Sequence, residues 1–265
     1  MSRKTSLCIG INDYPGTGAD LSGCVNDVND WKQALTQRGF AVTTLLDREA
    51  TKSNMVEAMT KLMRDAGAGD TVVLQYSGHG SYVADLDGDE ADGRDEVLCP
   101  SDIGNNWYIS DDELYELFGL ANRQARVVFL SDSCHSGSVS RLRVSDGVGE
   151  KTTKQRFLPP SMFLRDFEVA DAAVAARSKK RKSKANKVLL ISGCQDTQTS
   201  ADAWFGSRAN GAFTYYALRA LKELGQGTDY SHWHAKIREY LPSVYYAQAP
   251  NLQGSNTQMR WRVLE

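Results

Sequence analysis

The chain has 265 residues, of which 41% are hydrophobic and 24% are charged, and its formal net charge is −2. These values are typical of a globular chain long enough to bury a core as one domain, and they argue against global disorder. No apolar run approaches the roughly 18 residues of a membrane span. The first residues also lack a signal-peptide pattern, so a cytoplasmic protein without a membrane segment is expected.

Short apolar, β-branched runs predict strands, and apolar residues at helical spacing predict helices between them. The expected strands are residues 6–11, 40–45, 71–76, 126–131, 188–192 and 259–264, and the expected helices are 25–38, 52–65, 111–118, 212–224 and 230–241. Gly39 and Pro242 mark helix ends, and Ser110 with Glu113 forms a capping box. The alternation indicates an α/β fold with a mostly parallel six-stranded sheet and helices on both faces.

Two charged segments interrupt this pattern. Residues 85–96 hold seven acidic residues and one arginine, and residues 141–187 hold 13 Lys and Arg against 5 Asp and Glu. An irregular basic stretch of this length between two core strands is expected as a mobile surface loop. The single domain is then divided into an N-terminal region (residues 1–140), a basic linker (residues 141–187) and a C-terminal region (residues 188–265).

Five cysteines are spread along the chain without a C-x-x-C pair: Cys8, Cys24, Cys99, Cys134 and Cys194. This pattern is neither a disulfide framework nor a common zinc spacing. Reduced thiols are therefore expected, and a claim of reactivity for any one of them needs its own argument.

Two short polar segments directly follow predicted strands. Residues 76–80 (Tyr-Ser-Gly-His-Gly) follow the third strand, and residues 131–137 (Ser-Asp-Ser-Cys-His-Ser-Gly) follow the fourth. Because the carboxyl ends of parallel strands meet at one sheet edge, His79 and Cys134 are expected to lie close together. A thiol beside an imidazole is the minimum set for acyl transfer. On periodicity alone, a buried structural cysteine and an unrelated loop histidine explain the pattern equally well.

These two segments resemble known motifs. Residues 76–80 are similar to the histidine motif of metacaspases and caspases, and residues 132–137 to the metacaspase cysteine motif. Further matching stretches lie at residues 9–12, 23–27, 191–196, 200–203 and 211–214, so the resemblance covers nearly the whole chain. It implies a caspase-like three-layer sandwich and a cysteine peptidase. With no adaptor-like region before Thr5, the chain resembles a prokaryotic metacaspase-like protein, with a type I-like catalytic domain and no prodomain.

The resemblance assigns roles around the reacting bond. Cys134 is implied as the nucleophile and His79 as the general base, with the backbone N–H groups of Gly80 and Cys134 forming an oxyanion hole. His135 is a rival base on paper, but neighbouring side chains in a loop seldom face each other, so we treat it as a bystander or a minor helper. Cys24 and Cys194 lack the close pairing that a zinc site with the dyad would need.

The resemblance also implies an S1 pocket, the pocket for the side chain before the scissile bond. Asp27 and Asp132 match its acidic residues, with Cys24 and Ser77 beside them. Two carboxylates attract Arg or Lys, so protein or peptide substrates with a basic residue at that position are implied. Taken singly, Asp27 is explained as a first-turn helix acid and Asp132 as a turn residue at a strand end.

The acidic segment raises the question of calcium. Asp85, Asp87, Asp89 and Glu96 fit an EF-hand-like spacing, but Glu90 stands where glycine is required and no helix pair flanks the loop. A solvated acidic loop is the plain alternative.

Metacaspases have a different calcium site, and Asp95, Asp111 and Asp112 resemble its ligands. A further family Asp is replaced by Arg141, which would weaken binding because a cation stands in place of a carboxylate. Calcium is thus expected as an activator of uncertain strength, and no organic cofactor is expected.

The basic segment lies where caspase-like proteins join their large-subunit-like and small-subunit-like regions, and such linkers are often cut by the enzyme itself. Its Lys and Arg residues are those that the implied pocket would accept. The candidate self-cleavage points are Lys151, Lys154, Arg156, Arg177, Lys179, Lys180, Arg181 and Lys182. The alternatives are a catalytically silent caspase-like scaffold, or a nucleic-acid binder, which the lack of interleaved aromatics and the acidic surroundings disfavour. A monomer is expected.

Overall fold

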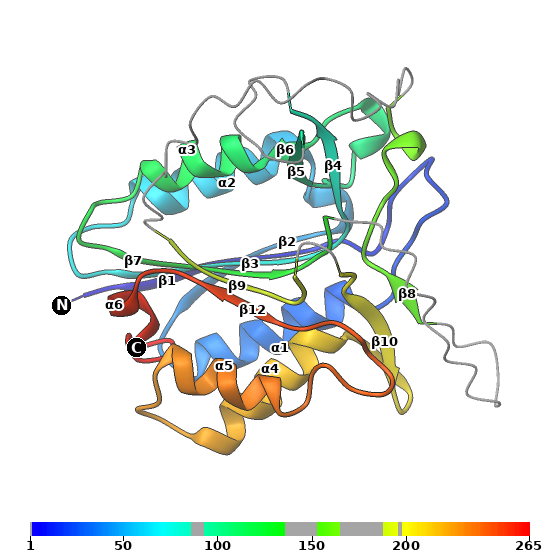
Figure 1. The fold of residues 1–265 in the computed structure, drawn as a ribbon. Helices are drawn as coiled ribbons and strands as arrows, with labels where there is room; N and C mark the ends of the chain where they lie inside the picture. Colours follow the sequence, from blue (N-terminus) through cyan, green and yellow to red (C-terminus); the bar gives the residue numbers. More distant parts are fainter. Residues whose placement is uncertain (1, 86–92, 136–152, 165–187, 196–197) are drawn as a thin grey trace.

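The structure is a computed structural model that describes residues 2–85, 93–135, 153–164, 188–195 and 198–265. A six-stranded sheet in the order β12-β9-β7-β3-β1-β2 forms its centre (Figure 1). The strands are β1 (Lys4–Gly10), β2 (Ala41–Leu46), β3 (Thr71–Ser77), β7 (Arg126–Asp132), β9 (Val188–Ser192) and β12 (Asn251–Gln253). All neighbours are parallel except β12, which pairs antiparallel with β9 at one edge.

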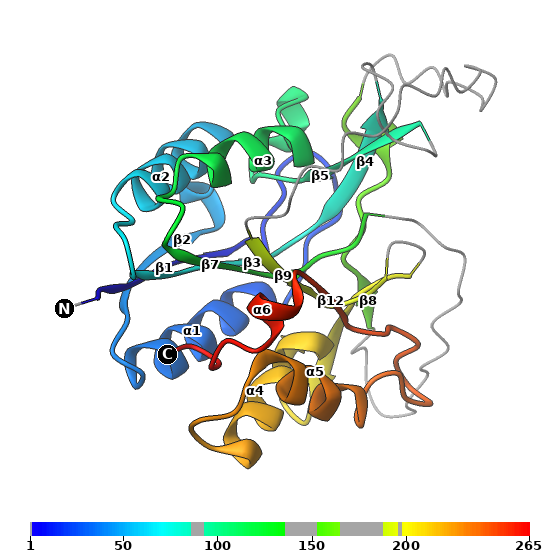
Figure 2. The same cartoon turned by 60° about the vertical axis from the view of Figure 1, so that its left-hand side comes forward.

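Helices cover both faces of the sheet (Figure 2). One face carries α2 (Lys52–Arg64) and α3 (Asp111–Gly119), and the other carries α1 (Cys24–Thr36), α4 (Ala212–Leu224) and α5 (Tyr230–Arg238). On β7, Val127 and Phe129 pack in the core with α2 and α3, whereas Val128 and Leu130 pack with α1 and α4. Both faces are thus buried, and each such side chain contributes about 1.5–3 kcal/mol. The described residues include no helix long and apolar enough to cross a membrane.

Two small sheets lie beyond the carboxyl ends of the central strands. One has the order β4-β5-β6, and the other has the order β11-β10-β8. Their strands are β4 (Gly80–Ala84), β5 (Arg94–Leu98), β6 (Ile109–Ser110), β8 (Lys154–Gln155), β10 (Ala201–Phe205) and β11 (Arg208–Gly211). Short helical segments complete the fold: η1 (Asp47–Glu49), η2 (Ile103–Asn105), η3 (Pro160–Met162) and α6 (Asn256–Met259).

The predicted α/β class, the parallel sheet and its two helical layers are confirmed, as is the Ser110–Glu113 capping box. The strand predicted at 259–264 is wrong. Ser255 and Gln258 form a capping box that starts α6, and Leu264 has a φ of 59°, which a strand does not tolerate. The sixth strand is β12 instead, whose three residues are too few to produce a clear apolar pattern.

Candidate active site

The two polar loops start side by side. β3 and β7 pair in a register that places Ser77 opposite Asp132, so residues 78–80 and 133–135 leave the same sheet edge. A Cβ on Gly78 would lie 2.6 Å from the hydroxyl oxygens of Tyr14 and Tyr76, so only glycine fits there. Because the backbone at Gly78 lies so close to Tyr14, the Tyr14 hydroxyl can accept a hydrogen bond from the His79 backbone N–H at 2.7 Å.

The His79 imidazole is buried and held in one tautomer. Its Nε2 lies 2.6 Å from the backbone oxygen of Ala19 and therefore carries the proton, since a carbonyl can only accept. Nδ1 has no hydrogen-bond partner within the described residues. Burial lowers the pKa of His79 to about 4, although the backbone carbonyl of Ala19 raises it to some extent. The ring is therefore neutral at pH 7, with Nδ1 as a free base.

The Cys134 thiol is fully buried beside the start of β10. Its Sγ contacts the backbone N–H of Ser200 and lies 3.5 Å from the backbone oxygen of the same residue. The Cys194 thiol donates to the Ser133 backbone oxygen at 3.5 Å, and its pKa is raised first by a hydrogen bond with Cys134 and then by burial. Sulfur is thus fixed between a backbone amide and a neighbouring thiol.

Arg156 occupies the space between the two loops. Its carbonyl oxygen accepts hydrogen bonds from the backbone N–H groups of Gly80 at 3.0 Å and Cys134 at 3.2 Å. Its own N–H donates to the backbone oxygen of Ser200 at 3.0 Å. The Arg156 carbonyl is thus bound by both loops, the one that carries His79 and the one that carries Cys134.

The Arg156 side chain fills a closed pocket of carboxylates. Its guanidinium has no solvent exposure; Nη2 lies 2.7 Å from Asp27 and 3.0 Å from Asp202, and Nη1 lies 3.2 Å from Asp132. A Cβ on Gly211 would fall against Nη1 and the Asp132 carboxylate, so this glycine forms a wall of the pocket. The pocket therefore binds a planar cation with three negative groups.

Two of these carboxylates have different electrostatic surroundings. Asp132 accepts hydrogen bonds from the backbone and hydroxyl of Thr214, at 3.0 and 2.8 Å, and from the Ser200 hydroxyl at 2.6 Å. Asp27 accepts from Gly211 N–H at 2.9 Å. Burial raises the pKa of Asp27 to about 7; the Arg156 charge lowers that pKa, and the negative Asp132 raises it. Asp27 is thus a pocket carboxylate that titrates near neutrality.

The residues around Arg156 run through the site as an extended segment. On one side, β8 pairs antiparallel with β10. On the other side, Leu158 N–H donates to the Gly80 oxygen at 2.9 Å, and the Ser81 hydroxyl donates to the Leu158 oxygen at 2.6 Å. Leu158 is fully buried in the core under α2 and α3. This stretch of the basic segment, expected as a surface loop, is therefore anchored on both sides of Arg156.

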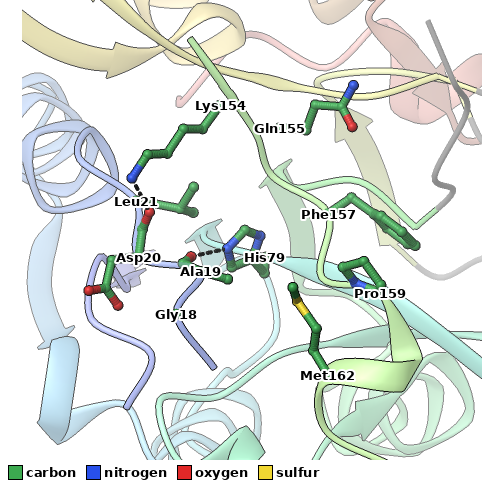
Figure 3. Close-up of a pocket in the computed structure, with 10 residues that line it drawn as sticks. All are labelled: Gly18, Ala19, Asp20, Leu21, His79, Lys154, Gln155, Phe157, Pro159 and Met162. Atoms are coloured by element: carbon green, nitrogen blue, oxygen red, sulfur yellow. Dashed lines mark hydrogen bonds between the residues drawn. The ribbon is translucent and has the colours of Figure 1, made fainter. Parts of the chain in front are cut away.

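A cavity of about 160 Å³ lies beside His79. Figure 3 shows it between the loop 18–21 and the chain around Arg156, with Phe157, Pro159 and Met162 on one wall. Lys154 crosses its rim, where Nζ donates to the Asp20 backbone oxygen at 2.7 Å. A side chain next to Arg156 thus has space close to the imidazole.

The remaining candidates are three side chains near the site and six basic residues outside the described ranges. Cys24 lies near Arg156: its pKa is raised mainly by burial and lowered by the Arg156 charge. Ser77 is buried and accepts a hydrogen bond from Gln75 at 2.8 Å. His135 has its Nδ1 against Gly80, without a hydrogen-bond partner among the residues that the structure describes. The candidates outside the described residues are Lys151, Arg177, Lys179, Lys180, Arg181 and Lys182.

The proposed calcium ligands do not form a complete site among the described residues. Asp111 starts α3, and its Oδ1 is buried without a hydrogen-bond partner in that portion of the chain. Its pKa is raised by burial first and then by the negative charges of Asp112 and Glu96. No group of three or more His, Cys, Asp or Glu side chains is placed to hold a metal in the ranges described, and residues 86–92 and Arg141 lie outside them.

Sequence reasoning missed several residues of this site. Asp202 contributes the third carboxylate, Ser200 contacts both the Cys134 thiol and the Arg156 backbone, and Ala19 fixes the imidazole. The one available signal was an acid at 202 in an otherwise apolar strand. Ala19 acts through its backbone oxygen, and Ser200 contacts Cys134 and Arg156 through its backbone; contacts of this kind do not depend on residue type and cannot be predicted from it.

Comparisons with known proteins identify the family of this chain. Residues 3–260 match the family model described as Caspase domain. Metacaspase-1A of Aspergillus fumigatus is 33% identical over 96% of this chain and 69% of its own length, and Metacaspase-1 of Mycosarcoma maydis is 33% identical over 96% and 71%.

Two solved structures have a similar fold. The protein GSU0716 from Geobacter sulfurreducens aligns with a TM-score of 0.75 at 33% identity, over 99% of this chain and 98% of that one. Caspase-1 from Spodoptera frugiperda aligns with a TM-score of 0.60 over 96% and 86%, and at 11% identity this similarity concerns the fold alone.

Proposed function

The chain belongs to the caspase-domain peptidases of the metacaspase type, and from that premise we propose that it is a cysteine endopeptidase that cuts after arginine or lysine. One observation carries the proposal. The Arg156 carbonyl accepts two backbone N–H bonds, from Gly80 and from Cys134, while its guanidinium lies among three carboxylates. A peptide carbonyl held by two amides beside a thiol is the arrangement that acyl transfer requires.

The proposed mechanism gives sulfur and imidazole the roles that the family resemblance implies, and it is supported by the shared sheet edge from which their two loops leave. Cys134 Sγ attacks the carbonyl carbon and forms a C–S bond, and His79 Nδ1 takes the thiol proton. The N–H groups of Gly80 and Cys134 stabilise the oxyanion, an effect worth about 10²–10³-fold per donor. The C–N bond then breaks, and the proton passes from Nδ1 to the leaving amine. Water, deprotonated by His79, releases the acid and regenerates the thiol.

We further propose that the Arg156–Phe157 bond is the first substrate. Lys154 and Gln155 pair with β10 as an added strand, and Phe157 and Leu158 continue along β4. Strand addition is a common way of holding a peptide, because its backbone hydrogen bonds do not depend on sequence. Arg156 is therefore our preferred choice among the self-cleavage candidates.

The test combines fragment mapping with a peptide assay. Purified protein is incubated and its fragments are identified by mass spectrometry, and we expect a new N-terminus at Phe157. A fluorogenic peptide with arginine before the reporter should be hydrolysed by the native protein and not by Cys134→Ala. Equal signals from both proteins would contradict the proposal and favour a catalytically silent scaffold.

For calcium, we propose a weak activating site beside Asp111. The support is a buried carboxylate oxygen of Asp111 that has no hydrogen-bond partner among the described residues and lies in negative surroundings. Because the described donors are fewer than the six to eight oxygens that Ca²⁺ prefers, we expect affinity in the millimolar range. Added Ca²⁺ should raise the rate of self-cleavage and EDTA should return it to baseline, and Asp111→Asn should remove the response. An unchanged rate with both reagents would exclude this role.

A further inference from the structure

Asp202 lies on β10 and contacts Nη2 of Arg156, whereas Asp132 contacts Nη1, and three groups contact the Asp202 carboxylate. Oδ2 accepts the backbone N–H of Ser22 at 2.8 Å, Oδ1 accepts that of Gly23 at 2.9 Å, and Oδ1 also lies 3.0 Å from Arg156 Nη2. A Cβ on Gly23 would come within 2.6 Å of Oδ1, so glycine is required for this approach. The carboxylate is therefore fixed before a substrate arrives.

We propose that Asp202 is a specificity-determining residue that makes this pocket select arginine over lysine. The inference rests on the proposed function, because it concerns the side chain that the same pocket binds. Asp202 belongs neither to the Cys134–His79 pair nor to the carboxylate pair of Asp27 and Asp132, and the inference gives it a role of its own.

The reason lies in the shape of the two cations. Arginine carries two terminal nitrogens: Nη1 contacts the Asp132 carboxylate and donates to the Asp132 backbone oxygen at 3.1 Å, while Nη2 contacts Asp27 and Asp202. The fork thus reaches all three carboxylates at once. A lysine ammonium is a single point on a shorter stem, so it reaches only some of this set and leaves a buried carboxylate without a cation.

An unpaired buried charge is far more costly than a missing neutral hydrogen bond. Three carboxylates therefore penalise lysine more than two would. Removing the charge of Asp202 should weaken arginine binding, because one charged bond is lost, and should relieve the penalty on lysine. The ratio between the two residues, rather than the overall rate, is the property that Asp202 controls.

Self-cleavage of the full chain measures this ratio. The rate at the 156–157 bond is compared for the native protein and Arg156→Lys, and again for both in the presence of Asp202→Asn. The amide of Asp202→Asn keeps an oxygen for a backbone N–H but has no charge. We expect the Arg/Lys rate ratio to fall about tenfold or more. Asp65→Asn, which removes a charge at the exposed end of α2, should leave the ratio unchanged.

A second measurement does not depend on activity. In the Cys134→Ala background, Arg156→Lys should lower the unfolding midpoint, and it should lower it less when Asp202→Asn is also present. Asp202→Ser, whose hydroxyl can still accept from the loop, repeats the comparison should Asp202→Asn fold poorly.

The outcomes separate the two proposals. If Asp202→Asn lowers the cleavage rate and the unfolding midpoint equally with arginine and with lysine at position 156, Asp202 only supports the loop 22–23. That result would overturn the inference. Absence of cutting in the native protein would contradict the proposed function, while the midpoints of the inactive variants would still decide the role of Asp202.

Discussion

Replacing Arg156 with glutamine should reduce cutting of the 156–157 bond by at least about 100-fold. Glutamine keeps the backbone and most of the stem but loses the guanidinium, and with it three ion pairs of 2.7–3.2 Å in a pocket closed to solvent. Each charged hydrogen bond contributes about 1.5–3 kcal/mol, so loss of two already accounts for this factor. Fragments resolved over time by gel electrophoresis and mass spectrometry measure the rate.

Lys154→Gln is the matched control, because it removes a cation two residues away. Lys154 Nζ is exposed and contacts one backbone oxygen, so we expect less than about a threefold change. In the Cys134→Ala background, Arg156→Gln should also lower the free energy of unfolding by about 3 kcal/mol, since buried carboxylates lose their cation. Cutting of Arg156→Gln at the same bond and native rate would refute the assignment of Arg156.

The pH dependence of peptide cleavage should show an acid limb near pH 7 that belongs to the pocket. Burial raises the pKa of Asp27 to about 7, even though the Arg156 cation in the pocket lowers it. At a pH above the pKa of Asp27, its carboxylate is charged and attracts arginine. At a pH below that pKa, the carboxyl group is protonated and the attraction is lost. We expect kcat/KM for an arginine peptide to fall about tenfold per pH unit below the limb.

The imidazole should not cause this limb, because burial lowers the pKa of His79 to about 4. Asp27→Asn should therefore reduce kcat/KM at pH 8 and flatten the profile between pH 5 and 8. A native profile that stays level down to pH 5, with a limb near 4 alone, would contradict the role of Asp27. A limb near 7 that persists in Asp27→Asn would assign it to another group.

The central strands β3 and β7 could be recognised from the sequence because they are buried on both faces and each holds a short apolar run, residues 72–74 and 127–130. Their parallel pairing places Ser77 opposite Asp132. The meeting of the His79 and Cys134 loops could therefore be predicted. The small sheets could not, because β8 has two residues and β10 mixes Asp202 with alanines and aromatics, which gives no periodic signal.

The charge pattern of the basic linker wrongly predicted that all of it would lie on the surface. Composition describes residues 141–187 as uniformly basic, yet Arg156 is fully buried by three acids from distant regions of the chain. Such complementarity exists only after folding has brought α1, β7 and β10 together. The sequence could supply Arg156 as one basic residue among several, and only the structure distinguishes it from its neighbours.

The pairing of β9 with β7 determines what happens to the molecule after a break at Arg156. Five residues of β9 lie in register with β7, and Leu158 stays inserted under α2 and α3. The cores on both faces of the central sheet contain residues from before and after residue 156, so the two pieces share these interiors. A nicked molecule should therefore migrate as two bands under denaturing conditions and elute as one particle of unaltered size in native buffer.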